Sequence, residues 1–165
     1  VAMFQGKSEA GQRALGNRSL LFDPRVKNGR DIVNQIKLRE SFRPFAGTVL
    51  LEDANEWFDM RGLGDCSYMQ YAVNVRKSGI DAVVHVDNTC RVQTVTRRQN
   101  KHFYNLIKAF KNKTKVPILL NTSFNLGGEP LVETFDDAIR TLKKSDINYL
   151  YLPEIKSLIT AHKAY

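Results

Sequence analysis

The sequence predicts one α/β domain, or an α+β variant of it, built on a mixed, twisted sheet with packed helices. Three observations support this fold class. Residues 116–121 (VPILLN) form a continuously apolar run, as in central strands with both faces covered. Residues 100–111 carry an apolar stripe at helical spacing. A strand, loop, helix and strand then follow in order over 116–153, and the 165 residues suit a single domain.

The first half of the chain predicts fewer regular elements. Residues 1–28 are basic and interrupted by glycines, which indicates a mostly irregular segment. An amphipathic helix is expected from Asn28 or Asp31 to about Ser41. Residues 45–53 (FAGTVLLED) then predict a strand, followed by a short helical turn opened by Asp53.

The second half predicts strands before and after two helices. Residues 67–75 alternate as a strand does, and 81–96 are expected to form a hairpin around Asp87 and Asn88. The second of the two helices is expected over 134–145, with Thr134 and the acid three residues later in capping-box spacing. A closing strand is expected over 147–153.

Composition limits the class of protein and of partner. The 25 Lys and Arg against 17 Asp and Glu give a formal charge of +8, which favours anionic partners such as phosphates, nucleotides or nucleic acid. No apolar run approaches the roughly 20 residues of a membrane span. Without a signal-peptide pattern or a disulfide framework, a cytoplasmic location fits best.

A cluster of polar residues ends the strand predicted at 116–121. Asn121, Thr122, Ser123 and Asn125 offer uncharged donors and acceptors, and the glycines at 127–128 allow close approach to a ligand. Ligands bind preferentially beyond the carboxyl ends of central strands, which favours a phosphate or carboxyl-like ligand here. A turn that satisfies its own backbone fits the same residues equally well.

Basic residues near the end of the first predicted helix form a second group. Lys37 and Arg39 lie two positions apart, and Arg43 precedes a proline that holds it extended. All three reach one ligand only if it lies beyond the helix C-terminus. The alternative is that the three cations only complement the helix dipole, which favours positive charge at a helix C-terminus. For any one of the three residues taken alone, this alternative is favoured.

Two weaker groups complete the candidates. Arg13 and Arg18 flank a Gly-Asn turn in what resembles an anion-binding loop without the ending of a P-loop. His85, Asp87 and Arg91 come from or near the predicted hairpin, where His85 and Asp87 would share a face and act on one substrate or metal. A satisfied structural histidine is the more common outcome.

Four segments together resemble the C-terminal domain of the NodU-type O-carbamoyltransferases, in the same order, over about residues 5–152. They are GKSEAGQRALGNRSLLFDPR, NQIKLRESFRPFA, HVDNTCRVQTV and PILLNTSFNLGGEPLVETFDDAI. The resemblance implies a YrdC-like fold over residues 1–165 with a concave, positively charged nucleotide site. It also implies that residues 1–28 lead in, as a linker, from an N-terminal Kae1-like half.

The resemblance further implies a reaction. Carbamoyl phosphate and ATP, with Mg²⁺, would give carbamoyl-adenylate and pyrophosphate, and the Kae1-like half would pass the carbamoyl group to an acceptor hydroxyl. The Lys-x-Arg and Ser-x-Asn pairs of YrdC-like proteins match Lys37 with Arg39 and Ser123 with Asn125, which become the expected catalytic residues. The expected substrate and nucleotide ligands are Arg13, Arg18, Arg43, His85, Asp87, Arg91, Asn121 and Thr122. No metal-binding residue is identified.

Two features set limits on this expectation. Asn88 and Cys90 replace the Gly and Ala that the family usually has, which changes the turn. Without the N-terminal half, the chain is expected to activate or hydrolyse carbamoyl phosphate at most. A basic RNA-binding module of the same fold is the alternative, based on the net charge and the lysine-rich segment 97–115.

Overall fold

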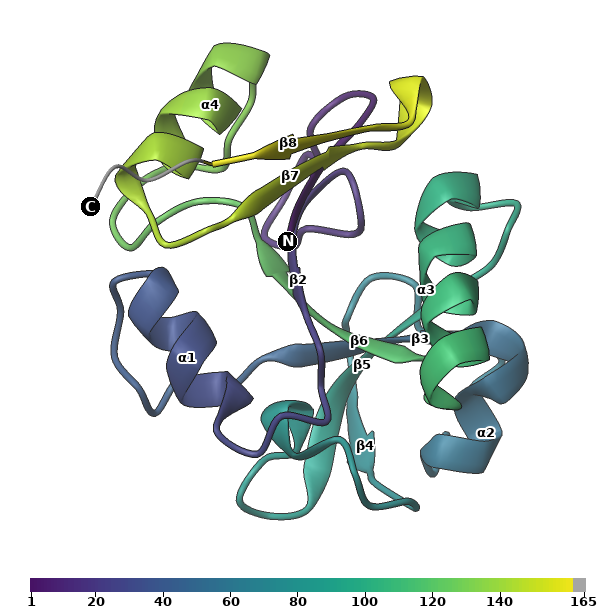
Figure 1. The fold of residues 1–165 in the computed structure, drawn as a ribbon. Helices are drawn as coiled ribbons and strands as arrows, with labels where there is room; N and C mark the ends of the chain where they lie inside the picture. Colours follow the sequence, from purple (N-terminus) through teal and green to yellow (C-terminus); the bar gives the residue numbers. More distant parts are fainter. Residues whose placement is uncertain (162–165) are drawn as a thin grey trace.

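The computed structural model describes residues 1–161 and contains one mixed sheet with helices on both faces (Figure 1). The last four positions of the expected 1–165 domain lie outside the described residues. The strands are β1 (Ala2–Phe4), β2 (Arg18–Phe22), β3 (Ala46–Leu50), β4 (Ala72–Asn74), β5 (Thr89–Val95), β6 (Ile118–Ser123), β7 (Tyr149–Leu152) and β8 (Ser157–Thr160). The α-helices are α1 (Gly29–Ile36), α2 (Ala54–Trp57), α3 (Lys101–Thr114) and α4 (Phe135–Lys144). The predicted α/β class with a mixed sheet is confirmed.

The strand order is β4-β5-β3-β6-β2-β1-β7-β8. The pairs β3–β5 and β1–β7 are parallel, and the remaining pairs are antiparallel. Because β6 runs opposite to β3, the end of β6 lies beside the start of β3, and β5 starts at the same edge. The predicted central position of β6 is confirmed. Residues near the ends of β3, β5 and β6 therefore lie close together.

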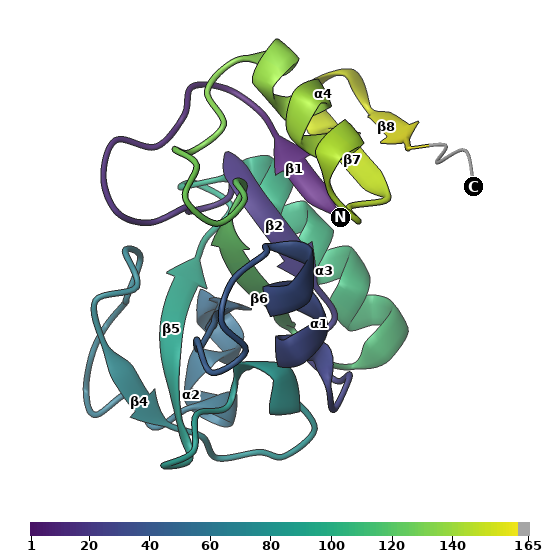
Figure 2. The ribbon, with the colours of Figure 1, turned by 90° about the vertical axis from the view of Figure 1, so that its left-hand side faces the viewer.

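Two apolar cores lie on opposite faces of the sheet. Figure 2 shows α1 in front of the sheet and α3 behind it. On the α3 face, Phe103 and Ile107 are buried against Leu21 and Leu119. On the other face, Val33 of α1 and residues of α4 belong to the larger core. The predicted apolar stripe of α3 is therefore confirmed as core.

The α3 face of the sheet becomes polar toward the shared strand end. Side chains two residues apart on a strand lie on the same face. Leu119 packs on α3, whereas Asn121, the next β6 residue on that face, lies beside Ala46 of β3. Ala46 in turn lies beside Arg91 of β5. The sheet thus places Arg91 and Asn121 on either side of a small residue, beyond the helix that covers the apolar part.

Several sequence-based boundaries are corrected. Residues 1–28 are mostly irregular, as expected, but they also contain β1 and β2, which were not predicted; both lie within the sheet, and β2 pairs with β6. The predicted hairpin over 81–96 is wrong: 81–83 form a short 3-10 helix, and the partner of β5 is β4. His85 and Asp87 consequently lie in a tight turn, where the Asn88 N–H donates to the carbonyl of His85.

The remaining differences are smaller. Helix α1 ends at Ile36, earlier than expected, and β8 was not predicted. The helix α4 with its capping box is confirmed, since Thr134 and Asp137 bond each other's backbone N–H groups. No helix within residues 1–161 is long and apolar enough to cross a membrane.

Candidate anion-binding site

Lys37 is the centre of the predicted site. It follows α1 directly, is only 2% exposed, and reaches the loop that follows β6. Its Nζ donates to the carbonyls of Ser123 at 2.5 Å and of Asn125 at 2.8 Å, and to Oδ1 of Asn125 at 2.9 Å. The Ser123 hydroxyl also donates to Asn125 Oδ1 at 2.7 Å. The structure therefore brings together the two pairs that sequence reasoning selected about 85 positions apart.

The charge of Lys37 is not balanced by an acid. Among the described residues no ion pair of Lys37 is formed, and its four acceptors are neutral oxygens. Burial, and to a lesser extent the positive charge of Arg39, lower the pKa of Lys37 from 10.5 to about 7. Desolvation disfavours the charged form of a buried amine, whereas a nearby anion favours it. The amine would therefore take up a proton when an anion binds. A lysine held this way suits binding of a phosphate or carboxylate.

The loop after α1 and the loop after β6 are in close backbone contact. The Gly127 N–H donates to the carbonyl of Lys37 at 2.7 Å. A Cβ at position 127 would lie 2.6 Å from the carbonyl oxygen of Leu38, so only glycine fits without a shift. Leu38 itself has φ of 53°. A non-glycine residue in the left-handed region costs free energy and occurs often at functional sites.

Three arginines line one cavity of about 110 Å³. Arg13 comes from the loop before β2, Arg39 from the loop after α1, and Arg91 from β5. Burial lowers the pKa of Arg39 and of Arg91, and neighbouring cations contribute: Arg43 and Arg91 act on Arg39, and Arg13 acts on Arg91. Among the described residues, no acidic side chain lines this cavity. Cations that repel each other around a cavity without acids indicate an anion-binding site.

Each arginine is held in a different way. Arg39 donates from Nε to Asn34 Oδ1 at 2.7 Å, and its guanidinium lies 4.5 Å from the centre of the Phe45 ring. Arg91 has its Nε buried without a hydrogen-bond partner among the described residues. Within residues 1–161, the one side-chain hydrogen bond of Arg13 is a long contact of 3.5 Å to the carbonyl of Gln12. The guanidinium of Arg39 is positioned in advance, whereas those of Arg13 and Arg91 have donors to give to a ligand.

A buried polar network supports the cavity from below. Asn121 Nδ2 lies 2.9 Å from Gln93 Oε1 and 3.1 Å from Thr48 Oγ1. It also donates to the carbonyl of Ala14 at 3.2 Å, while Gln93 Nε2 donates to that of Leu15. These bonds tie the loop before β2, which carries Arg13, to the sheet. Among predicted site residues, Asn121 is thus both a wall of the cavity and an anchor.

A wider cavity of about 570 Å³ adjoins the small one and shares Arg39 with it. Lys37, Asn125 and Gly127 line it. Arg43 lines it too, but Arg43 is exposed and paired with Glu40 at 2.7 Å. The two cavities differ in size by enough to suit one large and one small ligand.

Three predicted ligands have other partners in the structure. Arg18 is buried and donates to the carbonyls of Gln5 at 2.6 Å and Glu133 at 2.9 Å, with its guanidinium 3.6 Å from the Phe4 ring centre. His85 and Asp87 both contact Thr89, at 3.0 and 2.7 Å. None of the three lines either cavity. These contacts are structural in kind.

Sequence reasoning missed several supporting residues. Glu9 accepts from the backbone N–H groups of Leu15 at 2.7 Å and Asn17 at 2.8 Å, which shapes the Arg13 loop. Gln93 and Asn34 orient Asn121 and Arg39. A polar residue on the covered face of a strand or helix is the one available signal, because a buried amide needs partners.

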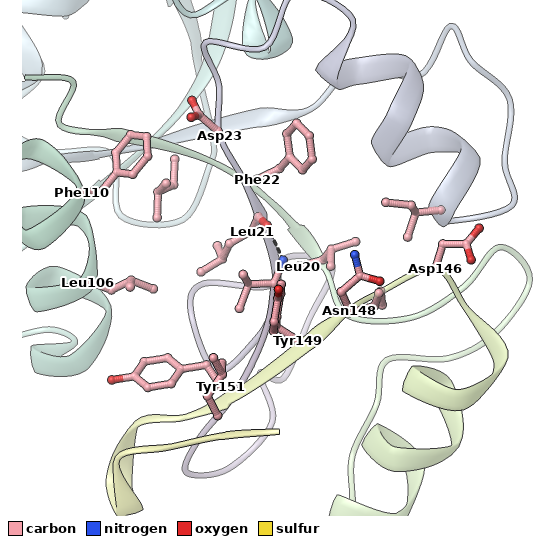
Figure 3. A pocket seen from close by; sticks show the side chains of 15 residues that line it. Leu20, Leu21, Phe22, Asp23, Leu106, Phe110, Asp146, Asn148, Tyr149 and Tyr151 are labelled. Carbon is pink, nitrogen blue, oxygen red and sulfur yellow. Dashed lines mark hydrogen bonds between the residues drawn. The ribbon is translucent and has the colours of Figure 1, made fainter. Parts of the chain in front are cut away.

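Another cavity, of about 550 Å³, lies between β2, β7 and α3 (Figure 3). Leucines and aromatic rings form most of its wall, and Asp23 and Asp146 are its charged side chains. Among the described residues, no lysine or arginine lines it. An anionic substrate is therefore favoured at the arginine cavity and not here.

The fold and the arginine cavity define an α/β domain with a positively charged cavity at the end of a central strand. Comparison with protein families then gives the family. The chain belongs to the carbamoyltransferase C-terminus family, whose model matches residues 1–158. The resemblance noted in the sequence is thereby confirmed.

Three individual relatives match this chain over most of its length. Nodulation protein NolO of Bradyrhizobium diazoefficiens is 46% identical over 155 residues, which are 91% of this chain and 28% of the relative. A 3'-hydroxymethylcephem-O-carbamoyltransferase of Amycolatopsis lactamdurans is 42% identical over 84% of this chain and 26% of its own length. Nodulation protein U of Rhizobium tropici is 34% identical over 92% and 26%. The chain thus spans about a quarter of the length of these relatives.

Proposed function

We propose that this domain binds ATP and carbamoyl phosphate and forms carbamoyl-adenylate, which a second domain uses to carbamoylate an acceptor hydroxyl. The single observation that carries the proposal is the convergence of Lys37, Arg39, Arg91 and Arg13 around two adjoining cavities, in a domain of the carbamoyltransferase family. Two polyanionic substrates would otherwise repel each other in one site. Fixed cations offset this repulsion, and among the described residues the smaller cavity has no acidic side chain in its wall.

The donor set fits a nucleotide with its metal ion. A planar guanidinium group binds two phosphate oxygens through parallel hydrogen bonds, and the Nε of Arg91 has no hydrogen-bond partner among the described residues. Residues 1–161 contain no group of three His, Cys, Asp or Glu side chains that could hold a metal. Mg²⁺ would therefore be held largely by the phosphates, where it would neutralise their charge.

The proposed formation of carbamoyl-adenylate takes two steps. Water first displaces phosphate from carbamoyl phosphate and leaves carbamate. A carbamate oxygen then bonds to the α-phosphorus of ATP as the bond to pyrophosphate breaks. Arg39 and Arg91 would hold the phosphates in line, and Lys37 would face the charge that moves onto the leaving pyrophosphate. Ser123 and Asn125 would position Lys37, to which they are already bonded.

Pyrophosphate exchange tests the proposal. Labelled pyrophosphate should enter ATP only when carbamoyl phosphate is present, and Arg91→Met should reduce the rate by at least about 100-fold. Lys113→Met is the matched control, because Lys113 is an exposed cation of α3 outside both cavities. The absence of exchange, together with no ATP binding by a folded chain, would refute the proposal.

The same control addresses the RNA-binding alternative. If the domain bound RNA through α3, Lys113→Met would weaken binding measured on filters and reduce its salt dependence. One of the lysines of this helix, Lys111, is already paired with Asp53 at 2.7 Å. Because of that pairing, α3 is a weaker surface for binding a polyanion than its sequence indicates.

A further inference from the structure

Strand β1 begins beside a cavity that separates its two neighbouring strands. This cavity of about 550 Å³ lies between β2 and β7, and Val1 forms part of its wall. Burial changes abruptly at this point, because Ala2 and Met3 are 0% exposed whereas Val1 is 44% exposed. Figure 3 shows side chains from β2, β7 and α3 around the space. The strands β2 and β7 are therefore joined by β1 from Ala2 onward and separated by the cavity before it.

The register of the sheet determines where a longer β1 would lie. Ala2 is beside Leu20 of β2, which is antiparallel, and beside Leu150 of β7, which is parallel. Two residues placed before Val1 would therefore lie beside positions 22–23 on one side and 147–148 on the other. All four of these positions line the cavity. The cavity thus lies on the path that a continued β1 would follow.

The backbone at the start of β1 already has the hydrogen bonds of a strand interior. The Val1 amine donates to the Leu21 carbonyl at 3.0 Å, and the Leu21 N–H donates to the Val1 carbonyl at 2.8 Å. Such exchanged bonds recur at every second residue of an antiparallel pair, so Asp23 directs its backbone N–H to the same side. Burial lowers the pKa of the Val1 amine to about 6. A peptide N–H at this position would make the same bond to Leu21 without burying a charge.

The cavity has an apolar wall on each face of the sheet. Leu106 of α3 lines it on one face, and Ile36 of α1 lines it on the other. Successive residues of a strand point to opposite faces, so two added apolar residues would each contact one of these walls. Strands covered on both faces consist of such uninterrupted apolar residues. A small apolar ligand would fill the same space but has no backbone groups to pair with those of β2 and β7.

We propose that the segment preceding this domain in the longer carbamoyltransferases enters the cavity as a continuation of β1, with two apolar residues between β2 and β7. Such a segment precedes the domain in the relatives, because the matched family is a C-terminal one and the chain spans about a quarter of their length. The domain is then joined to the N-terminal half through its own sheet and not through a flexible linker. The inference goes beyond the proposed function, because it concerns how the two halves are connected, whichever reaction they carry out.

The test extends this chain at its N-terminus by about eight residues, those that precede the domain in nodulation protein NolO, which covers the two strand positions and a short lead. In urea, the equilibrium constant for unfolding should fall at least about tenfold relative to the unextended chain. Deuterium exchange of the Asp23 backbone N–H should slow by a similar factor. The matched control carries proline at both positions before Val1, which keeps the length but removes the N–H donors. It should leave both quantities within about threefold of the unextended chain.

A second comparison connects the gain in stability with the cavity. In Leu106→Ala, which removes part of the wall, the tenfold gain from the extension should fall below about threefold. In Ile155→Ala the gain should be unchanged, because Ile155 is exposed and lies outside the cavity. The inference is wrong if the extended chain is no more stable than its proline control. It is also wrong if an apolar fluorescent dye binds the cavity of the extended chain as tightly as that of the unextended one.

Discussion

The pKa of Lys37 predicts how stability changes with pH. Burial lowers this pKa from 10.5 to about 7 in the folded protein. Between these two pH values the unfolded chain binds a proton that the folded chain does not, so stability must rise with pH. The contribution of Lys37 to the free energy of unfolding should increase by about 2.6 kcal/mol between pH 6 and pH 9.

Urea unfolding of two variants isolates this effect. Lys37→Met keeps the length of the side chain without its charge. The difference in unfolding free energy between unaltered protein and Lys37→Met should therefore grow in favour of the unaltered protein by that amount, while other titrating groups cancel. In Lys113→Met, the exposed control, the corresponding difference should stay constant within about 0.5 kcal/mol. A pH-independent difference for Lys37→Met would mean that the oxygens of Ser123 and Asn125 keep the ammonium charged, and the reasoning from burial would be wrong.

Two further predictions concern packing and thiols. Gly127→Ala should lower the free energy of unfolding by about 1–3 kcal/mol in urea melts, since its Cβ would meet the Leu38 carbonyl at 2.6 Å, whereas Gly64→Ala, which meets nothing within 4 Å, should be nearly neutral. Equal effects would show that the loops move apart freely. Neither Cys66 nor Cys90 should react with a thiol reagent at pH 8 before unfolding, because both are buried and burial raises the pKa of Cys90 to about 12. Rapid labelling of the native chain would contradict this.

The parts of the fold that were predicted correctly are those with a local signal. Strand β6 is marked by three buried apolar positions in a row, Ile118 to Leu120, and α4 by its capping box. Helix α3 is marked by its apolar stripe and by Asn100, whose side chain accepts from the N–H of Phe103. The association of Lys37 with Ser123 could be predicted only through the family resemblance, because no local pattern links residues 86 positions apart.

The errors arose where tertiary contacts override local preference. The run at 81–86 is rich in β-branched residues, which favours a strand. Instead, the Ala82 N–H donates to the carbonyl of Pro24, and His85 N–H donates to the carbonyl of Thr89, which closes a turn. Strand β2 was missed because its register with β6, Leu21 beside Asn121, depends on a partner about 100 positions away.

The site combines two kinds of cation, and the difference follows from their chemistry. Arginine stays charged even when half buried, so Arg39 and Arg91 repel each other until an anion arrives. A lysine can instead lose its proton on burial. With a pKa of about 7, Lys37 does so near neutral pH when no anion is bound, which lowers the free-energy cost of burying it. An anion that binds beside Lys37 must then bring the proton back. Charge at Lys37 is therefore greatest when the ligand is present, which is when the proposed reaction needs it.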